Sequence, residues 1–148
     1  MMTFCGHIGV ALITAGLFKL NPVLTIIGAV IPDLDILMSL TGRHWYDYHR
    51  KLTHSLLFLL AFIIPSFFYG FMIPISFGIL SHIIIDSMSH SGVMLLYPFS
   101  RKKFRISKLK QSKKFKEDTP IMMIKNWLYN TREILIESVI LIIGLVMI

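Results

Sequence analysis

The sequence predicts an all-α fold, a polytopic membrane bundle of about five hydrophobic helices with a basic cytoplasmic loop. Three observations support it: an excess of apolar residues, the spacing of the apolar stretches and a one-sided distribution of charge. Hydrophobic residues make up 55% of the chain and charged residues 16%, against about 45–50% and about 25% in soluble domains. A single domain of 148 residues has too little interior to bury that surplus, which therefore indicates a lipid environment.

The apolar stretches have the lengths expected of membrane helices, for which about 20 residues cross a bilayer. They cover residues 2–18, 22–40, 52–71, 73–90 and 134–148. Asn21-Pro22 ends the first stretch and starts the second, because proline is tolerated at a helix start and disrupts a helix interior. The last stretch is short for a full span, which leaves a tilted or interfacial helix open.

Positive charge lies on one side of this arrangement. If the stretches alternate across the membrane, every Lys and Arg in the sequence except Lys19 falls on the side of the N-terminus. The positive-inside rule places that side in the cytoplasm, so we expect a multi-pass protein of the inner (cytoplasmic) membrane. Within one membrane domain, 1–148, we distinguish the helices of a candidate site (1–97), a basic cytoplasmic or interfacial segment (98–131) and a C-terminal hydrophobic helix (132–148).

The segment from Arg101 to Lys116 intersperses basic residues with apolar ones such as Phe104 and Leu109. This pattern is typical of an element that lies on anionic lipid head groups; a solvated loop that only fixes topology is the alternative. Charge confined to one segment does not indicate a nucleic-acid surface, so no nucleic-acid partner is expected. The single cysteine, Cys5, excludes an intrachain disulfide. The oligomeric state is left open.

Ionisable side chains lie inside these stretches, where each needs a partner because its transfer into hydrocarbon is costly. With a rise of 1.5 Å per residue, all of them fall in the cytoplasmic leaflet, at depths of about 5–15 Å. His82 and Asp86 are four residues apart and share one helix face. The ionisable residues that lie well inside the stretches are His7, Asp33, Asp35, His82 and Asp86, and His54 lies just inside the third stretch.

Such a group of histidines and aspartates on one leaflet predicts a bound cation. Imidazole and carboxylate ligands favour Zn²⁺, with Mn²⁺ or Fe²⁺ as alternatives, as one or two ions. Taken singly, each residue also has a structural explanation: an acid that caps the turn after Pro32, or a buried histidine hydrogen-bonded to an acid. The predicted metal ligands are His7, Asp33, His54, His82 and Asp86.

The order of these motifs resembles the YdjM/YbcI-type family of inner-membrane, metal-dependent hydrolases. The motifs are His7, PDLD at 32–35, HRKLTHSLL at 49–57, HIIID at 82–86 and GVMLLYPFS at 92–100. The order is also similar to the metal sites of zinc-dependent phospholipase C and P1-type nucleases. That second likeness implies one ion on Asp33, His54, His82 and Asp86, and a second on His7 and Asp86, with Asp86 bridging. The further His and Glu ligands of those enzymes have no match after His90.

We therefore expect a metal-dependent hydrolase that cleaves a phosphoester in or near a lipid head group, using metal-activated water at the cytoplasmic face. Asp35 or another aspartate that binds no metal is the expected proton acceptor, and Arg50 or His49 is expected to hold an anionic head group at the rim of the site. The sequence contains no Gly-x-Ser-x-Gly motif, so serine hydrolysis is not supported. The alternatives are a divalent-metal transporter or sensor, and a structural metal site.

Overall fold

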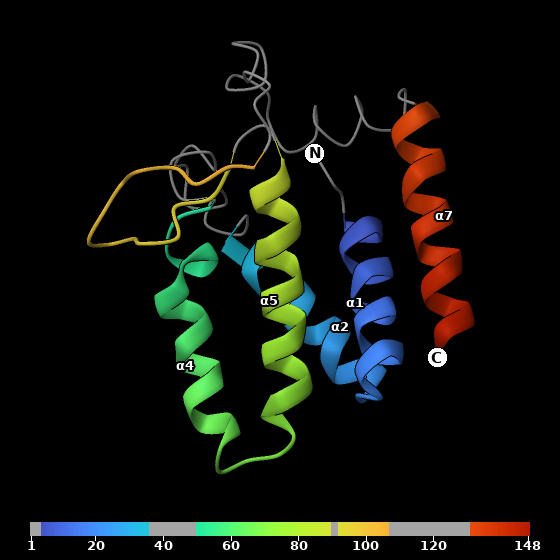
Figure 1. Cartoon of the computed structure of the whole chain (residues 1–148), viewed down its shortest axis with the longest axis horizontal. Helices are drawn as coiled ribbons and strands as arrows, with labels where there is room; N and C mark the ends of the chain where they lie inside the picture. Colours follow the sequence, from blue (N-terminus) through green and yellow to red (C-terminus); the bar gives the residue numbers. More distant parts are fainter. Residues whose placement is uncertain (1–3, 36–49, 90–91, 107–130) are drawn as a thin grey trace.

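The computed structural model describes residues 4–35, 50–89, 92–106 and 131–148. Within these ranges the chain folds into five α-helices without strands (Figure 1), so the predicted all-α fold is confirmed. Each described helix falls inside one of the predicted apolar stretches or within a few residues of it. The helices are α1 (Phe4–Phe18), α2 (Pro22–Val30), α4 (Leu56–Ser66), α5 (Met72–Met88) and α7 (Thr131–Met147).

Helix α2 is shorter than the sequence predicted. It begins as expected, because the Asn21 side chain accepts a hydrogen bond from the Leu24 N–H at 3.1 Å and Pro22 occupies the first turn. The α-helix ends at Val30, and residues 31–35 continue as a 3₁₀-helix. Pro32 lies in this continuation, where its missing N–H removes an α-helical hydrogen bond. Residues 36–40 lie outside the described residues.

The third apolar stretch also differs from its predicted bounds. Residues 52–54 form a short 3₁₀-helix, η2 (Leu52–His54), and the α-helix starts only at Leu56. Ser55 separates the two, because its extended backbone ends η2 and its Oγ accepts the Phe58 N–H at 3.2 Å. None of the helices in the ranges that the structure describes is both long and apolar enough to cross a membrane.

Glycines allow the helices to pack with their backbones close together. The most extensive packing is between α2 and α5 and between α1 and α7. A Cβ atom on Gly78 would overlap the backbone of α2, while one on Gly9 would lie 2.9 Å from backbone atoms of Leu141 in α7. Small residues at such crossings are typical of helices that associate in membranes. The crossing at Gly78 holds the inner face of α5 against the end of α2.

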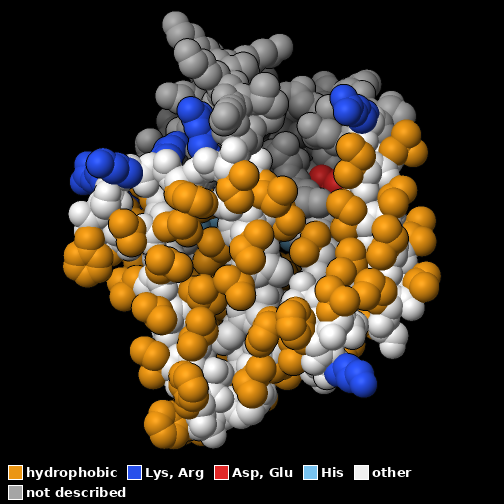
Figure 2. All heavy atoms as spheres, in the orientation of Figure 1, with side chains coloured by type: hydrophobic (Ala, Val, Ile, Leu, Met, Phe, Trp, Pro, Cys, Tyr) orange, Lys and Arg blue, Asp and Glu red, His pale blue; other side chains and the backbone are white. Residues whose placement is uncertain are grey.

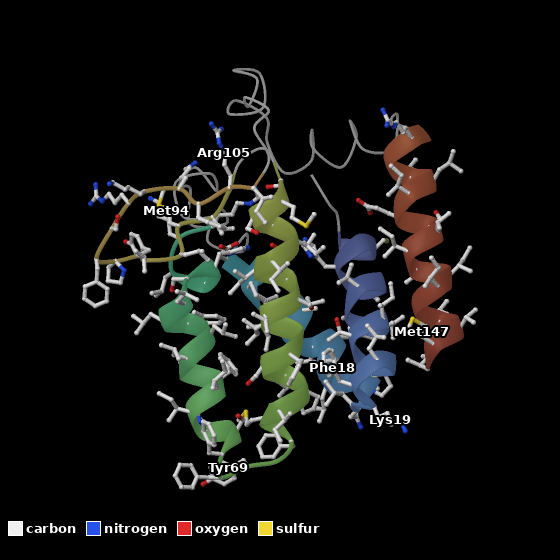
Figure 3. All side chains as sticks on the ribbon, in the orientation of Figure 1. Phe18, Lys19, Tyr69, Met94, Arg105 and Met147 are labelled. Atoms are coloured by element: carbon white, nitrogen blue, oxygen red, sulfur yellow. The ribbon has the colours of Figure 1, made fainter. Side chains whose placement is uncertain are left out.

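Large apolar side chains cover the outside of the bundle, as Figure 2 shows for one face. The apolar core is smaller: Leu59, Ile75, Ile79, Ile83 and Val93. Two basic residues lie at opposite ends of the molecule, Arg105 at one end and Lys19 at the other (Figure 3). The five described helices alternate in direction from each one to the next, so α1 and α7 run parallel (Figure 1).

Gly78→Ala tests the close approach of α2 and α5. Alanine favours a helix by about 1 kcal/mol over glycine, yet here its methyl group would force the two backbones apart. We expect the free energy of unfolding in detergent to fall by about 1–3 kcal/mol. Gly70→Ala is the control, because nothing lies within 4 Å of a Cβ atom at that position. A Gly78→Ala variant as stable as wild type would contradict this packing.

Candidate metal centre

Four segments bring ionisable side chains to one buried position. Helix α1 contributes His7, the 3₁₀ continuation of α2 contributes Asp33, η2 contributes His54, and α5 contributes His82 and Asp86. None of the five is more than 8% exposed. The structure thus brings together all five residues that the sequence predicted as metal ligands.

Four of these residues form a cage, which we define as Asp33, His54, His82 and Asp86. The Nε2 atoms of His54 and His82 are 3.0 Å apart. Oδ1 of Asp33 lies 3.4 Å from Nε2 of His82 and 3.7 Å from Nε2 of His54. Oδ2 of Asp86 lies 3.4 Å from Nε2 of His54 and 3.9 Å from Nε2 of His82. Each residue therefore points one potential ligand atom at the same small volume.

The five separations given above are close to those between the ligands of a tetrahedral metal ion. Zinc binds imidazole nitrogen and carboxylate oxygen at about 2.0–2.1 Å, which separates the ligands of a tetrahedron by about 3.3–3.4 Å. The separations given above, 3.0 to 3.9 Å, lie on both sides of that value. His54, His82 and Asp86 also form one group whose ligand atoms all lie within 4.8 Å of one another.

His7 lies beside the cage. Its ring stacks on that of His82, with centroids 3.9 Å apart and an interplanar angle of 16°. Its Nε2 is 3.7 Å from Oδ1 of Asp86, the oxygen that does not face the histidines of the cage. Its Nδ1 is buried and has no hydrogen-bond partner among the described residues. With Asp33 and His82 it forms a second group of potential ligands, so His82 belongs to both groups.

Asp35, the expected proton acceptor, faces the opposite side of the His54 ring. Its Oδ2 accepts hydrogen bonds from the Thr53 hydroxyl at 2.8 Å and from the Arg50 backbone N–H at 3.3 Å. The same oxygen lies 3.6 Å from Nδ1 of His54, whereas the cage lies at Nε2. Asp33 and Asp35 thus lie at opposite nitrogens of the His54 ring.

Arg50 is buried, whereas the sequence predicted an exposed position at the rim of the site. Its side chain is paired with Asp86: Nη2 donates to Oδ1 at 2.9 Å, and Nε lies 2.9 Å from Oδ2. Nη1 donates to the Ser89 hydroxyl at 2.7 Å. The guanidinium therefore balances the charge of a carboxylate that α5 holds in the interior. His49 and His90 lie outside the described residues.

Sequence reasoning missed several groups around the site. Thr53 and Ser89 support His54 and Arg50 through side-chain hydrogen bonds, and a hydroxyl gives no signal of such a role in sequence. The Ala29 carbonyl oxygen lies 2.6 Å from Nδ1 of His82, and a backbone carbonyl gives no signal in the sequence either. Glu137 on α7 is another buried acid, only 3% exposed, with a visible signal as an acid inside the last apolar stretch, and it belongs to neither group of potential ligands.

A comparison with protein families supports the first of the two resemblances. The family model described as YdjM inner membrane protein matches residues 1–148. The chain belongs to the YdjM inner membrane protein family. This membership indicates an inner-membrane location. It does not by itself establish metal binding or hydrolysis.

A search of curated proteins found one further likeness, to the uncharacterized protein YvsG of Bacillus subtilis (strain 168). The two sequences are 36% identical over an 89-residue alignment, which covers 49% of this chain and 53% of that protein. The alignment therefore spans about half the length of this relative. No solved structure is significantly similar to the chain.

Arg50→Leu tests the buried pair. The change leaves the Asp86 carboxylate buried without its cation, so we expect the free energy of unfolding, measured in detergent with a chelator, to fall by about 3–5 kcal/mol. Adding Asp86→Leu should recover part of the loss, because no unpaired carboxylate remains. Arg101→Leu, at an exposed position, should change stability by less than about 0.5 kcal/mol. Equal losses for Arg50→Leu and Arg101→Leu would argue against the pair.

Proposed function

We propose that this protein is a membrane-embedded, metal-dependent hydrolase that cleaves a phosphoester in or near a lipid head group at the cytoplasmic face. The observation that carries the proposal is the cage, in which the ligand atoms of Asp33 and of Asp86 each lie 3.4 to 3.9 Å from the two histidine Nε2 atoms, themselves 3.0 Å apart. Two buried carboxylates beside two buried imidazoles need positive charge, because an uncompensated buried charge is costly. A divalent cation supplies that charge at the point where the ligand atoms converge.

The proposed site takes one ion, with zinc preferred and Mn²⁺ or Fe²⁺ as alternatives. Nδ1 of His82 lies 2.6 Å from the Ala29 carbonyl oxygen, which only accepts, so His82 has one nitrogen left for a metal. Oδ1 of Asp86, the oxygen that would bridge to a second ion, already accepts a hydrogen bond from Arg50. In this proposal the guanidinium replaces the second ion implied by the likeness to phospholipase C.

A bound ion would lower the pKa of a water molecule and polarise the phosphoryl oxygen under attack. Arg50 contributes a fixed positive charge beside the cage, where it stabilises negative charge developing on phosphoryl oxygens. We assign proton acceptance to His7, because its buried Nδ1 has no hydrogen-bond partner in the described part of the chain. Asp35 is not assigned this role, since its Oδ2 faces Thr53 and Nδ1 of His54.

We place the bundle in the inner membrane as a multi-pass protein with the site end in the cytoplasm. Exposed apolar side chains support this placement, including Leu17 at 64% and Val146 at 81%. The alternating helix directions (Figure 1) also support it, as does Arg105 lying at the opposite end from Tyr69 (Figure 3). By the positive-inside rule, the end bearing most basic residues faces the cytoplasm.

Residues 92–106 supply the lipid contact in this proposal. Phe99 is 88% exposed and Leu96 58% exposed, and both precede the exposed run Arg101–Lys103. Apolar and basic side chains together favour anionic head groups. The loop is also joined to the site, because the Met94 N–H donates to the Arg50 carbonyl at 3.4 Å. Residues 107–116 of the basic segment lie outside the described residues.

A structural metal site is the second candidate, and one observation favours it. Four protein ligands fill a tetrahedral shell, as in structural zinc sites, whereas catalytic zinc usually keeps one position for water. The ion pair between Arg50 and Oδ2 of Asp86 favours catalysis. The guanidinium competes with the metal ion for this oxygen, the fourth ligand, and a water molecule could then take that coordination position. Both candidates predict a bound ion, and only the first predicts turnover.

The test uses purified protein reloaded with Zn²⁺ or Mn²⁺ and assayed with a chromogenic phosphodiester and with anionic phospholipids. Wild type should bind one ion per chain and hydrolyse at least one substrate class only when loaded. Asp86→Asn should lower metal affinity and turnover by more than the about 10–100-fold typical of an outer-sphere change. Glu137→Gln removes a buried carboxylate outside the cage and should retain both.

Each outcome separates the candidates. One ion per chain without turnover of any substrate would leave the structural site standing and remove the hydrolase. A wild type that binds no divalent ion would remove both. Turnover of phospholipid but not of the soluble phosphodiester would favour a substrate held at the membrane surface by residues 92–106.

A further inference from the structure

We propose that Asp35 and Thr53 form a positioning pair that fixes the proton of His54 on Nδ1 and so directs its Nε2 lone pair into the cage. The inference rests on the proposed metal site and assigns residues that touch neither the ion nor the substrate. Asp35 thereby acts through Thr53 on a ligand, instead of as the proton acceptor that the sequence suggested.

The Thr53 hydroxyl has only one proton to donate. Its Oγ1 is 2.8 Å from Oδ2 of Asp35 and 3.0 Å from Nδ1 of His54. An ionised carboxylate only accepts hydrogen bonds, so the hydroxyl proton goes to Asp35. Oγ1 can then only accept from His54, and Nδ1 of His54 must carry a hydrogen. A neutral imidazole with a proton on Nδ1 has its lone pair on Nε2.

The hydrogen-bond partner of Nδ1 also fixes the ring proton of His82, although the partner is different. The Ala29 carbonyl oxygen, 2.6 Å from Nδ1 of His82, cannot donate, so this Nδ1 is also protonated. Both neutral rings then direct lone pairs at each other, with Nε2 atoms 3.0 Å apart. Two lone pairs at that distance repel unless a cation, either a proton or a metal ion, lies between them. The outer partners therefore set both histidines for metal binding, as hydrogen bonds do around many metal sites.

Asp35 also holds the backbone that presents Thr53. Its Oδ2 accepts the Arg50 N–H at 3.3 Å, and Arg50 has a left-handed backbone with φ of +64°. That conformation is costly for a residue other than glycine and persists only when its surroundings hold it. Replacing Asp35 would therefore disturb both the backbone and the hydroxyl, whereas replacing Thr53 isolates the hydroxyl.

The experiment titrates zinc into the purified full-length protein against a chromophoric chelator and compares Thr53→Val with Thr53→Ser. Valine keeps the shape and removes the hydroxyl, so zinc should bind about 10–100-fold more weakly. Serine restores the hydroxyl and should restore affinity. Asp35→Asn added to Thr53→Val should weaken binding further only through the Arg50 backbone, because the hydroxyl that transmits its other effect is already gone. The control is Thr25→Val, which removes a buried hydroxyl bonded to the Asn21 carbonyl at 2.8 Å and should leave zinc affinity unchanged.

A second readout does not depend on metal. Nitrogen-15 NMR of the His54 ring in chelator-treated protein should show Nδ1 protonated in wild type and in Thr53→Ser, and a changed proton distribution in Thr53→Val. Wild-type affinity in Thr53→Val, or weak binding in Thr53→Ser as well, would overturn the positioning role. If wild type binds no zinc, the proposed function fails instead, and the NMR comparison still decides whether Thr53 fixes the proton.

Discussion

The close approach of two histidine nitrogens is the constraint on which the rest of the site depends. The Nε2 atoms of His54 and His82 are 3.0 Å apart, between the carboxylates of Asp33 and Asp86. Water is largely excluded at this depth, since His54 is 0% and His82 1% exposed. Such a group is stable only with positive charge close by. Arg50 supplies part of it from one side, and the centre of the cage is where a metal ion would supply the rest.

Backbone packing gives the cage its dimensions. Gly28 and Gly78 let α2 and α5 approach until a Cβ on either would overlap the other helix. That approach brings the Ala29 carbonyl to His82 and the 3₁₀ continuation of α2 to the cage. α1 supplies His7, and its own close partner is α7, through Gly9 and Gly144. The small residues thus act on the site indirectly, by setting the distances between the elements that carry the ligands.

The sequence predicted the ligand set because membrane depth makes a buried acid or histidine conspicuous. His7, Asp33, His54, His82 and Asp86 stood out for that reason, and the structure brings them together. The apolar stretches predicted the helices, and Asn21-Pro22 predicted where α2 begins. The end of α2 and the start of α4 were not predicted, because they depend on local effects: the missing N–H of Pro32 and the hydrogen bond from the Phe58 N–H to Ser55.

The surroundings of the ligands were not predictable, for a related reason. Thr53 and the Ala29 carbonyl act through geometry that no composition or spacing reveals. Arg50 lies in a basic stretch of sequence and so looked like a surface residue, yet its partners Asp86 and Ser89 come from a helix more than 30 residues away. Long-range pairing of this kind appears only in the folded chain.

X-ray absorption spectroscopy at the zinc edge of the zinc-loaded protein shows whether the residues of the cage hold the ion. A site built by the cage predicts four nitrogen or oxygen neighbours at about 2.0–2.1 Å, with the outer scattering of two imidazole rings. The two-imidazole signal should become a one-imidazole signal in His82→Ala protein that still retains zinc. A sulfur neighbour at about 2.3 Å, or a spectrum of fully hydrated zinc, would contradict the account.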